Sequence, residues 1–314
     1  KIASQSAREG GALTLDDLAD HEATWTDPIA QPYGAIELHE IPPNGQGLAA
    51  QIALGILDHL EVRSLPPGSA DWIHYQVETM KIAIRASFDH FADPRAMTVS
   101  PEALLEPSSL ARAAASISRS ASQPPPVALP VSDDTVYLTA ADADGRMVSM
   151  IQSNFQGFGS GIVIEGTGIA MQNRGAGFSL EPGHPNQVDG GKRPFHTIIP
   201  GFVTHQGSPA LAFGVMGGHM QHQGHVQMVT RIFDHGENPQ AASDAPRWHV
   251  TPDYTLALEA GTPLPVVREL AERGHQPALI PDENLFGGAQ LIYRMADGYC
   301  GAADHRKEGA AVGF

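Results

Sequence analysis

Apolar residues in the first third of the chain recur at the spacing of α-helices. Residues 71–91 are the clearest case, because apolar side chains three or four positions apart form one face: Ile73, Val77, Met80, Ile84 and Phe88. Pro94 ends this helix, since proline cannot continue the helical hydrogen bonds. An apolar run predicts a second helix over 46–60. Cap and stop signals predict shorter helices at three places: residues 1–9, from Thr14 and from Ser100.

After residue 135 the pattern changes from helical spacing to alternation. Apolar side chains at 136, 138 and 140 share one face of a predicted strand, residues 142–145 turn, and 147–151 return as its partner. Other segments with strand patterns are 33–41, 210–215, 286–294 and the C-terminal residues; helical patterns cover 218–233 and 265–273. Periodicity alone therefore predicts a mixed α and β fold.

A run rich in proline and serine, residues 116–130, precedes the hairpin, and Thr135 stands at the start of its first strand. This arrangement has two interpretations. It is an ordinary linker followed by an ordinary hairpin, or it is the cleavage region of a self-processing enzyme. In the second case the threonine hydroxyl becomes a nucleophile, and the α-amine released by cleavage serves as its base.

Composition narrows the classes of function. The chain has 314 residues and 42% hydrophobic residues, which is enough for a large core of one or two domains. A net charge of −16 without a basic stripe argues against a nucleic-acid partner. We find no apolar run long enough for a membrane span. The single cysteine, Cys300, excludes an internal disulfide framework. These features predict a soluble enzyme.

Several collinear segments resemble the γ-glutamyltranspeptidase family. The segments similar to its small subunit are 157–163, 166–169, 172–179, 191–200, 216–218 and 301–306. Upstream, residues 41–47 (Ile-Pro-Pro-Asn-Gly-Gln-Gly) and the helix over 78–93 resemble the C-terminal part of its large subunit. The resemblance covers essentially the whole chain, and motifs in the right order are more specific than any one motif.

The resemblance implies an α+β fold, the four-layer αββα sandwich of N-terminal-nucleophile hydrolases. Residues 1–134 would be the C-terminal part of the large subunit and 135–314 the small catalytic subunit of one precursor, separated by cleavage between Asp134 and Thr135. The chain begins with Lys1, so we expect that an N-terminal portion with any signal region is missing. The family implies no metal and no organic cofactor. The compartment and the oligomeric state stay open.

The resemblance also implies catalytic roles. Thr135 matches the nucleophile, and Ser153 matches a supporting hydroxyl. The family's second threonine is replaced by Val136. Gly217 and Gly218 match the oxyanion-binding glycines, although a plain turn between a strand and a helix is the alternative.

The acyl-binding residues depart from the family. Gly177 stands where γ-glutamyl enzymes have an acid that holds the α-amine, and Arg174 stands where they have a glutamine. His196 and Thr197 replace paired serines, and Asn154 is a further candidate for substrate binding. The pocket thus loses an anion and gains a cation, which favours acyl groups that have a carboxylate but no α-amine.

The sequence therefore predicts a γ-glutamyltransferase-like amidohydrolase that acts on small-molecule amides through an acyl-threonine, resolved by water or by an amino acid or peptide. The alternatives are an acylase for glutaryl-like groups and an inactive, unprocessed binding homologue. His219, His222 and His225 recur every three residues, but polar lining of the site explains them better than metal binding. Residues 192–194 are expected to be a structural loop. Residues 157–161 lack the remaining residues of a phosphate-binding loop.

Overall fold

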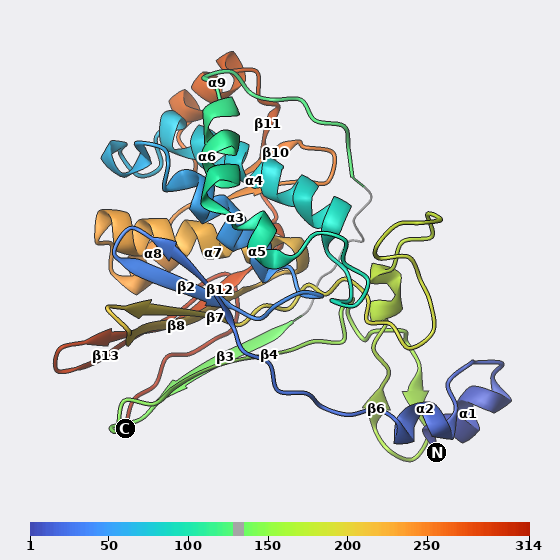
Figure 1. Ribbon diagram of the computed structural model, residues 1–314. Coiled ribbons are helices and arrows are strands. Elements are labelled where there is room, and N and C mark those ends of the chain that lie inside the picture. The colour runs from blue at the N-terminus through green and yellow to red at the C-terminus, as the bar shows by residue number, and fades with distance from the viewer. Residues whose placement is uncertain (128–134) are drawn as a thin grey trace.

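The computed structural model describes residues 1–127 and 135–314. Its centre is a six-stranded antiparallel sheet (Figure 1). The strands lie in the order β1 (Ile29–Tyr33), β2 (Ile36–Glu40), β7 (Gly201–His205), β8 (Ser208–Met216), β12 (Gly288–Met295) and β13 (Gly298–Ala303). Consecutive residues of β8 are buried, because structure covers both of its faces.

Helices cover one face of this sheet (Figure 1). α3 (Gly47–Leu57) is buried along its whole length and packs against α4 (Ala70–His90), whose first turn is capped by Ser69. α7 (Gln221–Val229) lies on β8, and α8 (Pro239–Asp244) lies near β12 and β13. Gly224 permits the close approach of α7, because a Cβ at this position would lie 2.5 Å from Val215.

The hairpin of β3 (Val136–Ala141) and β4 (Met147–Gln152) packs on the opposite face of the large sheet. Its buried Tyr137 lies over Gly214 of β8, where a larger residue would overlap the ring. Its outer face is apolar and exposed, and Val136 is 65% exposed. Within the described ranges, helices, sheet and hairpin form successive layers, and no further helical layer covers the hairpin.

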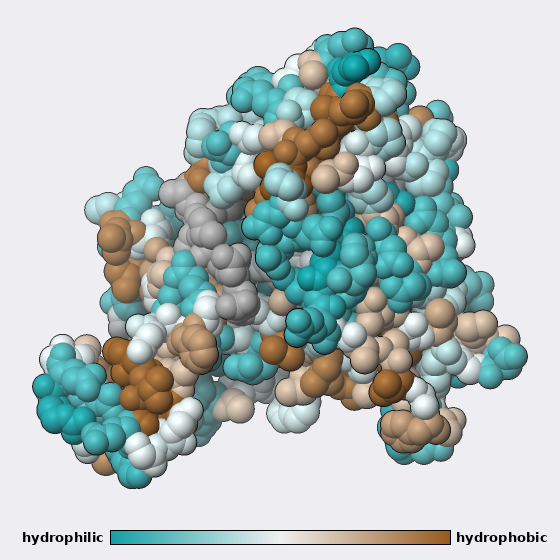
Figure 2. Space-filling model, turned by 180° about the vertical axis from the view of Figure 1, so that it is seen from behind, coloured by the Kyte–Doolittle hydropathy of each residue, from teal (hydrophilic) through white to brown (hydrophobic). Residues whose placement is uncertain are grey.

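A small lobe projects from the body of the molecule. It contains α1 (Ile2–Arg8), α2 (Leu15–Ala19) and the short hairpin of β5 (Val163–Ile164) and β6 (Ile169–Ala170). Gln5 joins the two parts by donating to Val163 O and accepting from Glu165 N–H. Figure 2 shows apolar side chains gathered on this lobe beside polar ones, and Val163 and Ile169 are among the exposed residues.

The other elements complete the fold. A three-stranded sheet has the order β11-β10-β9, with α9 packed beside it. The bounds are α5 (Pro101–Leu104), α6 (Pro107–Ser116), β9 (Trp248–Val250), β10 (Leu256–Glu259), α9 (Leu264–Glu272) and β11 (Pro277–Ile280), with 3₁₀ turns η1 (Val62–Ser64), η2 (Arg174–Gly177), η3 (Gly218–Met220) and η5 (Glu283–Phe286) and a π-helical turn η4 (Thr230–Asp234). None of the described helices is long and apolar enough to cross a membrane.

Most of the elements predicted from periodicity and caps are confirmed. The helix predicted over 71–91 is α4, and Thr14 forms the predicted capping box with Asp17. The prediction of one helix over 218–233 was wrong in detail, because a 3₁₀ turn and a π-helical turn flank α7. The prediction of a strand from residue 286 was also inaccurate, because Phe286 belongs to η5 and β12 starts at Gly288.

Candidate active site

Thr135 and Ser153 meet at the open end of the β3–β4 hairpin. Val136 pairs with Gln152, so the residues just outside this pair face each other. Thr135 is 5% exposed, and its hydroxyl donates to Ser153 Oγ at 3.2 Å. Ser153 Oγ also accepts the backbone N–H of Phe155 at 2.8 Å. The hairpin register thus brings together two of the residues predicted from the sequence. Asp134, the other side of the predicted cleavage bond, lies outside the described residues.

Gly217 and Gly218 form a turn between β8 and η3, called the glycine turn below. Their φ angles are +126° and +55°, in the region that residues with a side chain rarely adopt. A Cβ on Gly217 would lie 2.9 Å from the Cα of Gly287, so packing also requires glycine there. The turn leads directly into η3 and α7.

Arg174 lies in η2 and is a buried cation. It is 7% exposed, Nη1 donates to Thr197 Oγ1 at 3.2 Å, and Nη2 has no hydrogen-bond partner among the described residues. Its Cζ lies 5.3 Å from the centre of the Phe155 ring. Desolvation lowers the pKa of Arg174 to about 10. No carboxylate within residues 1–127 and 135–314 forms an ion pair with it. The side chain therefore stays charged at neutral pH without a counter-ion from the described residues.

His196 and Thr197 form the segment beside Arg174, called the acyl segment below. Burial, together with the positive charges of Arg174 and Arg193, lowers the pKa of His196 to about 3, so the imidazole is neutral at neutral pH. Thr197 is buried and accepts the hydrogen bond from Arg174. The acyl segment therefore contributes neutral polar groups, and Arg174 contributes the positive charge.

Gly177 ends η2, and its lack of a side chain is required by packing. A Cβ there would lie 2.6 Å from Phe195 O, while Asn186 donates to Gly177 O at 2.6 Å. No acid can occupy this position without a shift of the backbone. Asn154 contributes a backbone contact, since Asn173 N–H donates to Asn154 O at 3.2 Å.

Gln46 connects the acyl segment to the glycine turn. Its side-chain Nε2 donates to Thr197 O at 2.6 Å and to Gly218 O at 2.8 Å. Sequence reasoning did not select Gln46; its only signal was its place in the segment 41–47 that resembles the large subunit. The contacts from Thr135 through Ser153 and Phe155 to Arg174, and from Thr197 through Gln46 to Gly218, gather the predicted residues in one region.

The three histidines of α7 and of the turn before it are buried. His225 was expected to line the site, but it is fully buried in the core. Its Nδ1 is hydrogen-bonded to Glu40 Oε1 at a distance of 2.6 Å. Among the described residues, the one cluster with suitable ligand spacing is His74, Glu78 and His275. Lys81 donates to Glu78 Oε1 at 2.8 Å, and Ser122 N–H donates to Glu78 Oε2 at 2.9 Å. This carboxylate already has a cationic partner, and the cluster fastens the segment that follows α6.

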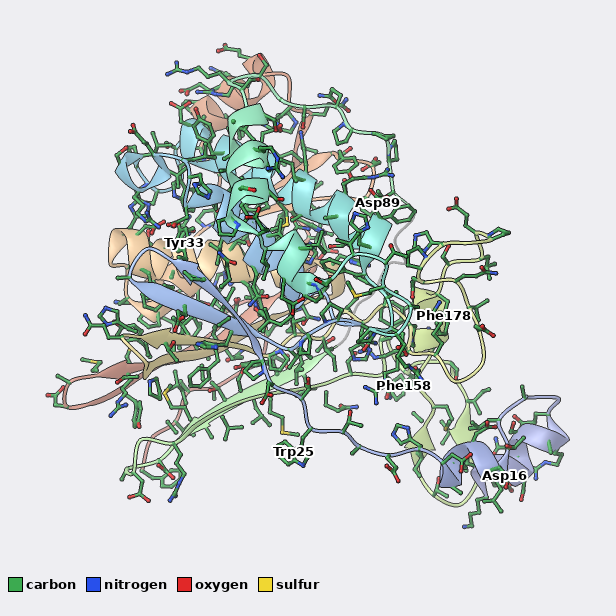
Figure 3. All side chains as sticks on the ribbon, in the orientation of Figure 1. Asp16, Trp25, Tyr33, Asp89, Phe158 and Phe178 are labelled. Atoms are coloured by element: carbon green, nitrogen blue, oxygen red, sulfur yellow. The ribbon has the colours of Figure 1, made fainter. Side chains whose placement is uncertain are left out.

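The expectation that residues 192–194 form a structural loop agrees with their contacts. Lys192 Nζ donates to the backbone oxygens of Pro185 and Gln187, and Arg193 N–H donates to Asp93. A separate cavity of about 410 Å³, lined by Tyr33, Arg63 and Asp234 among others, lies elsewhere. Figure 3 shows Tyr33 on the opposite side of the main body from Phe178, the residue that follows η2.

Comparisons with known proteins assign this chain to a protein family. A family profile described as gamma-glutamyltranspeptidase matches residues 1–314. The chain is 33% identical to the glutathione hydrolase-like YwrD proenzyme of Bacillus subtilis, over 100% of this chain and 61% of that protein. It is 34% identical to the oxamate amidohydrolase proenzyme of Klebsiella pneumoniae, over 100% of this chain and 60% of that protein.

The fold is also similar to that of a solved structure. The crystal structure of a cephalosporin acylase from Bacillus halodurans superimposes with a TM-score of 0.93 at 43% identity, over 98% of this chain and 57% of that one. The chain thus spans about three-fifths of the length of these relatives.

Proposed function

The chain belongs to the γ-glutamyltranspeptidase family, and from this premise we propose that it is the catalytic part of an N-terminal-threonine amidohydrolase. Its substrates would be amides of acids that carry a carboxylate and no α-amine, as in a glutaryl group. The observation that carries this proposal is Arg174, a buried cation whose Nη2 has no hydrogen-bond partner and which forms no ion pair with an acid among the described residues.

Thr135 is the proposed nucleophile. Cleavage of the bond between Asp134 and Thr135 would divide the precursor into a part ending at 134 and a small subunit of residues 135–314. The α-amine freed on Thr135 would then take the hydroxyl proton as Oγ1 attacks the substrate carbonyl carbon. The hydrogen bond from Thr135 to Ser153 Oγ, 3.2 Å long, supports this role because it orients the hydroxyl.

The glycine turn is the proposed oxyanion site. Attack forms a tetrahedral intermediate whose negative oxygen needs hydrogen-bond donors, and backbone N–H groups of Gly217 and Gly218 would supply them. Collapse of this intermediate breaks the C–N bond, and the leaving amine takes the proton held by the α-amine. Water, or an amino acid or peptide amine, then attacks the acyl-threonine and releases the acid or a new amide.

Electrostatics favour the acyl group without an α-amine. A carboxylate would accept from Arg174 Nη2, and a charged pair with two donors is stronger than a neutral hydrogen bond. A substrate ammonium beside the same guanidinium would be repelled, and burying it unpaired is costly. The name of one relative, oxamate amidohydrolase, describes a substrate amide with a carboxylate and no α-amine, and this agrees with the chemistry proposed for Arg174.

We also propose that the four-layer sandwich implied by the family resemblance is completed over the hairpin of β3 and β4. Its exposed apolar outer face supports this, since such a face is usually covered. The relatives have additional chain length to provide a cover.

The test uses the purified full-length protein and its Thr135→Ala variant. Intact mass and N-terminal sequencing should find a new N-terminus at Thr135 in the wild type and an uncut Thr135→Ala chain. The wild type should then hydrolyse glutaryl nitroanilide with a higher kcat/KM than γ-glutamyl nitroanilide. A strong preference for the γ-glutamyl compound would support a glutathione-type hydrolase instead. An uncut and inactive wild type would support a binding homologue.

A further inference from the structure

Gln46 is a fully buried side chain that connects two distant segments of the chain. It is 0% exposed, and both acceptors of its side-chain nitrogen are backbone carbonyls, Thr197 O at 2.6 Å and Gly218 O at 2.8 Å. Only the NH₂ end of an amide can donate to two carbonyls, so the orientation of this side chain is settled by its partners. Its Oε1 has no hydrogen-bond partner among the described residues.

The backbone around Gln46 is fixed to the acyl segment. Gln46 N–H donates to His196 O at 2.9 Å, and His196 N–H donates to Asn44 O at 2.9 Å, which forms a short parallel bridge. The side-chain bond to Gly218 O then extends this rigid unit to the glycine turn. One amide group therefore joins the proposed acyl-holding residue to the proposed oxyanion site, which lie on separate segments of the chain.

We propose that Gln46 is a positioning residue that sets the spacing between the acyl segment and the glycine turn. The inference rests on the proposed function, because it assigns meaning to that spacing. A substrate fixed by its carboxylate at Arg174 and Thr197 must present its carbonyl oxygen to the glycine turn. A misplacement of about 1 Å in such a geometry can reduce the rate about 100-fold.

The same region offers a matched control on α3. Gln51 is also 0% exposed, its Nε2 donates to Ile29 O at 2.6 Å and Leu38 O at 3.1 Å, and its Oε1 is also unpartnered among the described residues. It therefore connects two backbone carbonyls in the same way. Its partners belong to β1 and β2 and not to the site. A substitution at Gln51 therefore shows the effect of losing a buried amide alone, and a substitution at Gln46 adds the effect of altered site geometry.

The experiment compares Gln46→Glu and Gln51→Glu in the full-length protein at a temperature where both are folded. Each variant places a carboxyl oxygen against two carbonyls and should destabilise the fold. The readout is the ratio of kcat/KM for glutaryl nitroanilide to kcat/KM for acetyl nitroanilide, which lacks the distal carboxylate. This ratio does not depend on the fraction of folded enzyme.

We expect the ratio to fall at least 30-fold in Gln46→Glu, mainly through kcat, and to stay within threefold of wild type in Gln51→Glu. Lower pH should restore part of the glutaryl activity of Gln46→Glu, because the protonated acid regains one donor. Gln46→Met, which has similar volume and no charge, gives the same comparison without the pH effect if Gln46→Glu fails to fold.

Two results would overturn the inference: a wild-type ratio in Gln46→Glu or Gln46→Met, or equal losses in the variants of Gln46 and Gln51. If the wild type hydrolyses neither anilide, the proposed function itself fails. A wild type that is active toward the glutaryl compound, with a ratio that Gln46 does not affect, refutes only the positioning role.

Discussion

Replacing Arg174 by methionine should weaken the use of carboxylated substrates and stabilise the empty protein. The guanidinium is 7% exposed, bonds Thr197 Oγ1 at 3.2 Å and leaves Nη2 unpartnered among the described residues. A substrate carboxylate would supply the missing acceptor. Removing one partner of a buried charge pair costs about 3–5 kcal/mol. At about 1.4 kcal/mol per factor of ten, kcat/KM for glutaryl nitroanilide should fall roughly 150- to 5,000-fold.

Without substrate, the buried Arg174 side chain destabilises the folded protein. Burial already lowers the pKa of Arg174 to about 10, which reflects the desolvation of its charge. Methionine retains an extended apolar side chain and removes the charge. The variant loses a hydrogen bond to Thr197 worth about 1 kcal/mol, but it avoids a desolvation penalty of several kcal/mol. The free energy of unfolding in urea should therefore rise.

Both effects are measured on one preparation, with Arg193→Met as the control. Arg193 is exposed and also contributes a positive charge near His196. Its replacement should change kcat/KM less than threefold, because a solvated charge contributes little. A variant of Arg174 that keeps the wild-type kcat/KM for the glutaryl compound and loses stability would refute this reasoning. Arg174 would then be a structural residue.

Two further predictions concern protonation and specificity. Burial lowers the pKa of His249 to about 4, whereas the unfolded chain binds this proton near pH 6.5. The unfolded state therefore binds more protons as pH falls from about 6.5 to 4, so the stability contributed by neutral His249 is lost over this window. Urea unfolding at several pH values gives the slope of the free energy of unfolding against pH, which should be smaller by up to about 1.4 kcal/mol per pH unit in His249→Gln. The control His59→Gln, at an exposed position, should retain the wild-type slope. Equal slopes in all three proteins would contradict the argument. Gly177→Asp should not create γ-glutamyl specificity, because its Cβ would lie 2.6 Å from Phe195 O. We expect lower kcat/KM for both glutaryl and γ-glutamyl nitroanilides, with little change in the exposed control Ala176→Asp, and a gain for the γ-glutamyl compound would disprove the steric argument.

The elements that the sequence predicted well are those whose signals are local. The five apolar positions and the proline stop define α4 (Ala70–His90), and the Thr14 capping box marks α2 (Leu15–Ala19). β1 (Ile29–Tyr33) was missed, because it contains Pro32 and lies at the edge of the sheet, where a strand needs no regular alternation. β9, β10 and β11 were also missed, since strands of three or four residues are too short to show a clear periodicity.

The residues of the candidate site also divide into those that have a sequence signal and those that have none. The family resemblance implied that Thr135 and Ser153 act together, and the hairpin register explains why residues 18 positions apart come into contact. The role inferred for Gln46 has no local sequence signal, because its side-chain partners lie 151 and 172 positions away. No sequence signal indicated that Arg174 is buried without an ion pair to the described residues, since burial depends on segments that meet only in the folded chain.

The bonds that define the site have a different physical role from the hydrophobic core. Each buried hydrogen bond contributes only about 0.5–1.5 kcal/mol to folding, but leaving its acceptor unpaired costs about 1–3 kcal/mol. The acceptors of Gln46 lie on two segments whose spacing we propose to matter for catalysis, whereas those of Gln51 lie on neighbouring strands of the sheet. A core substitution should therefore change how much protein is folded and leave the ratio of two substrates unchanged. A substitution at Gln46 should change that ratio even when folding is complete. Site geometry in this fold thus depends on a few directional bonds, and substrate ratios measure it separately from stability.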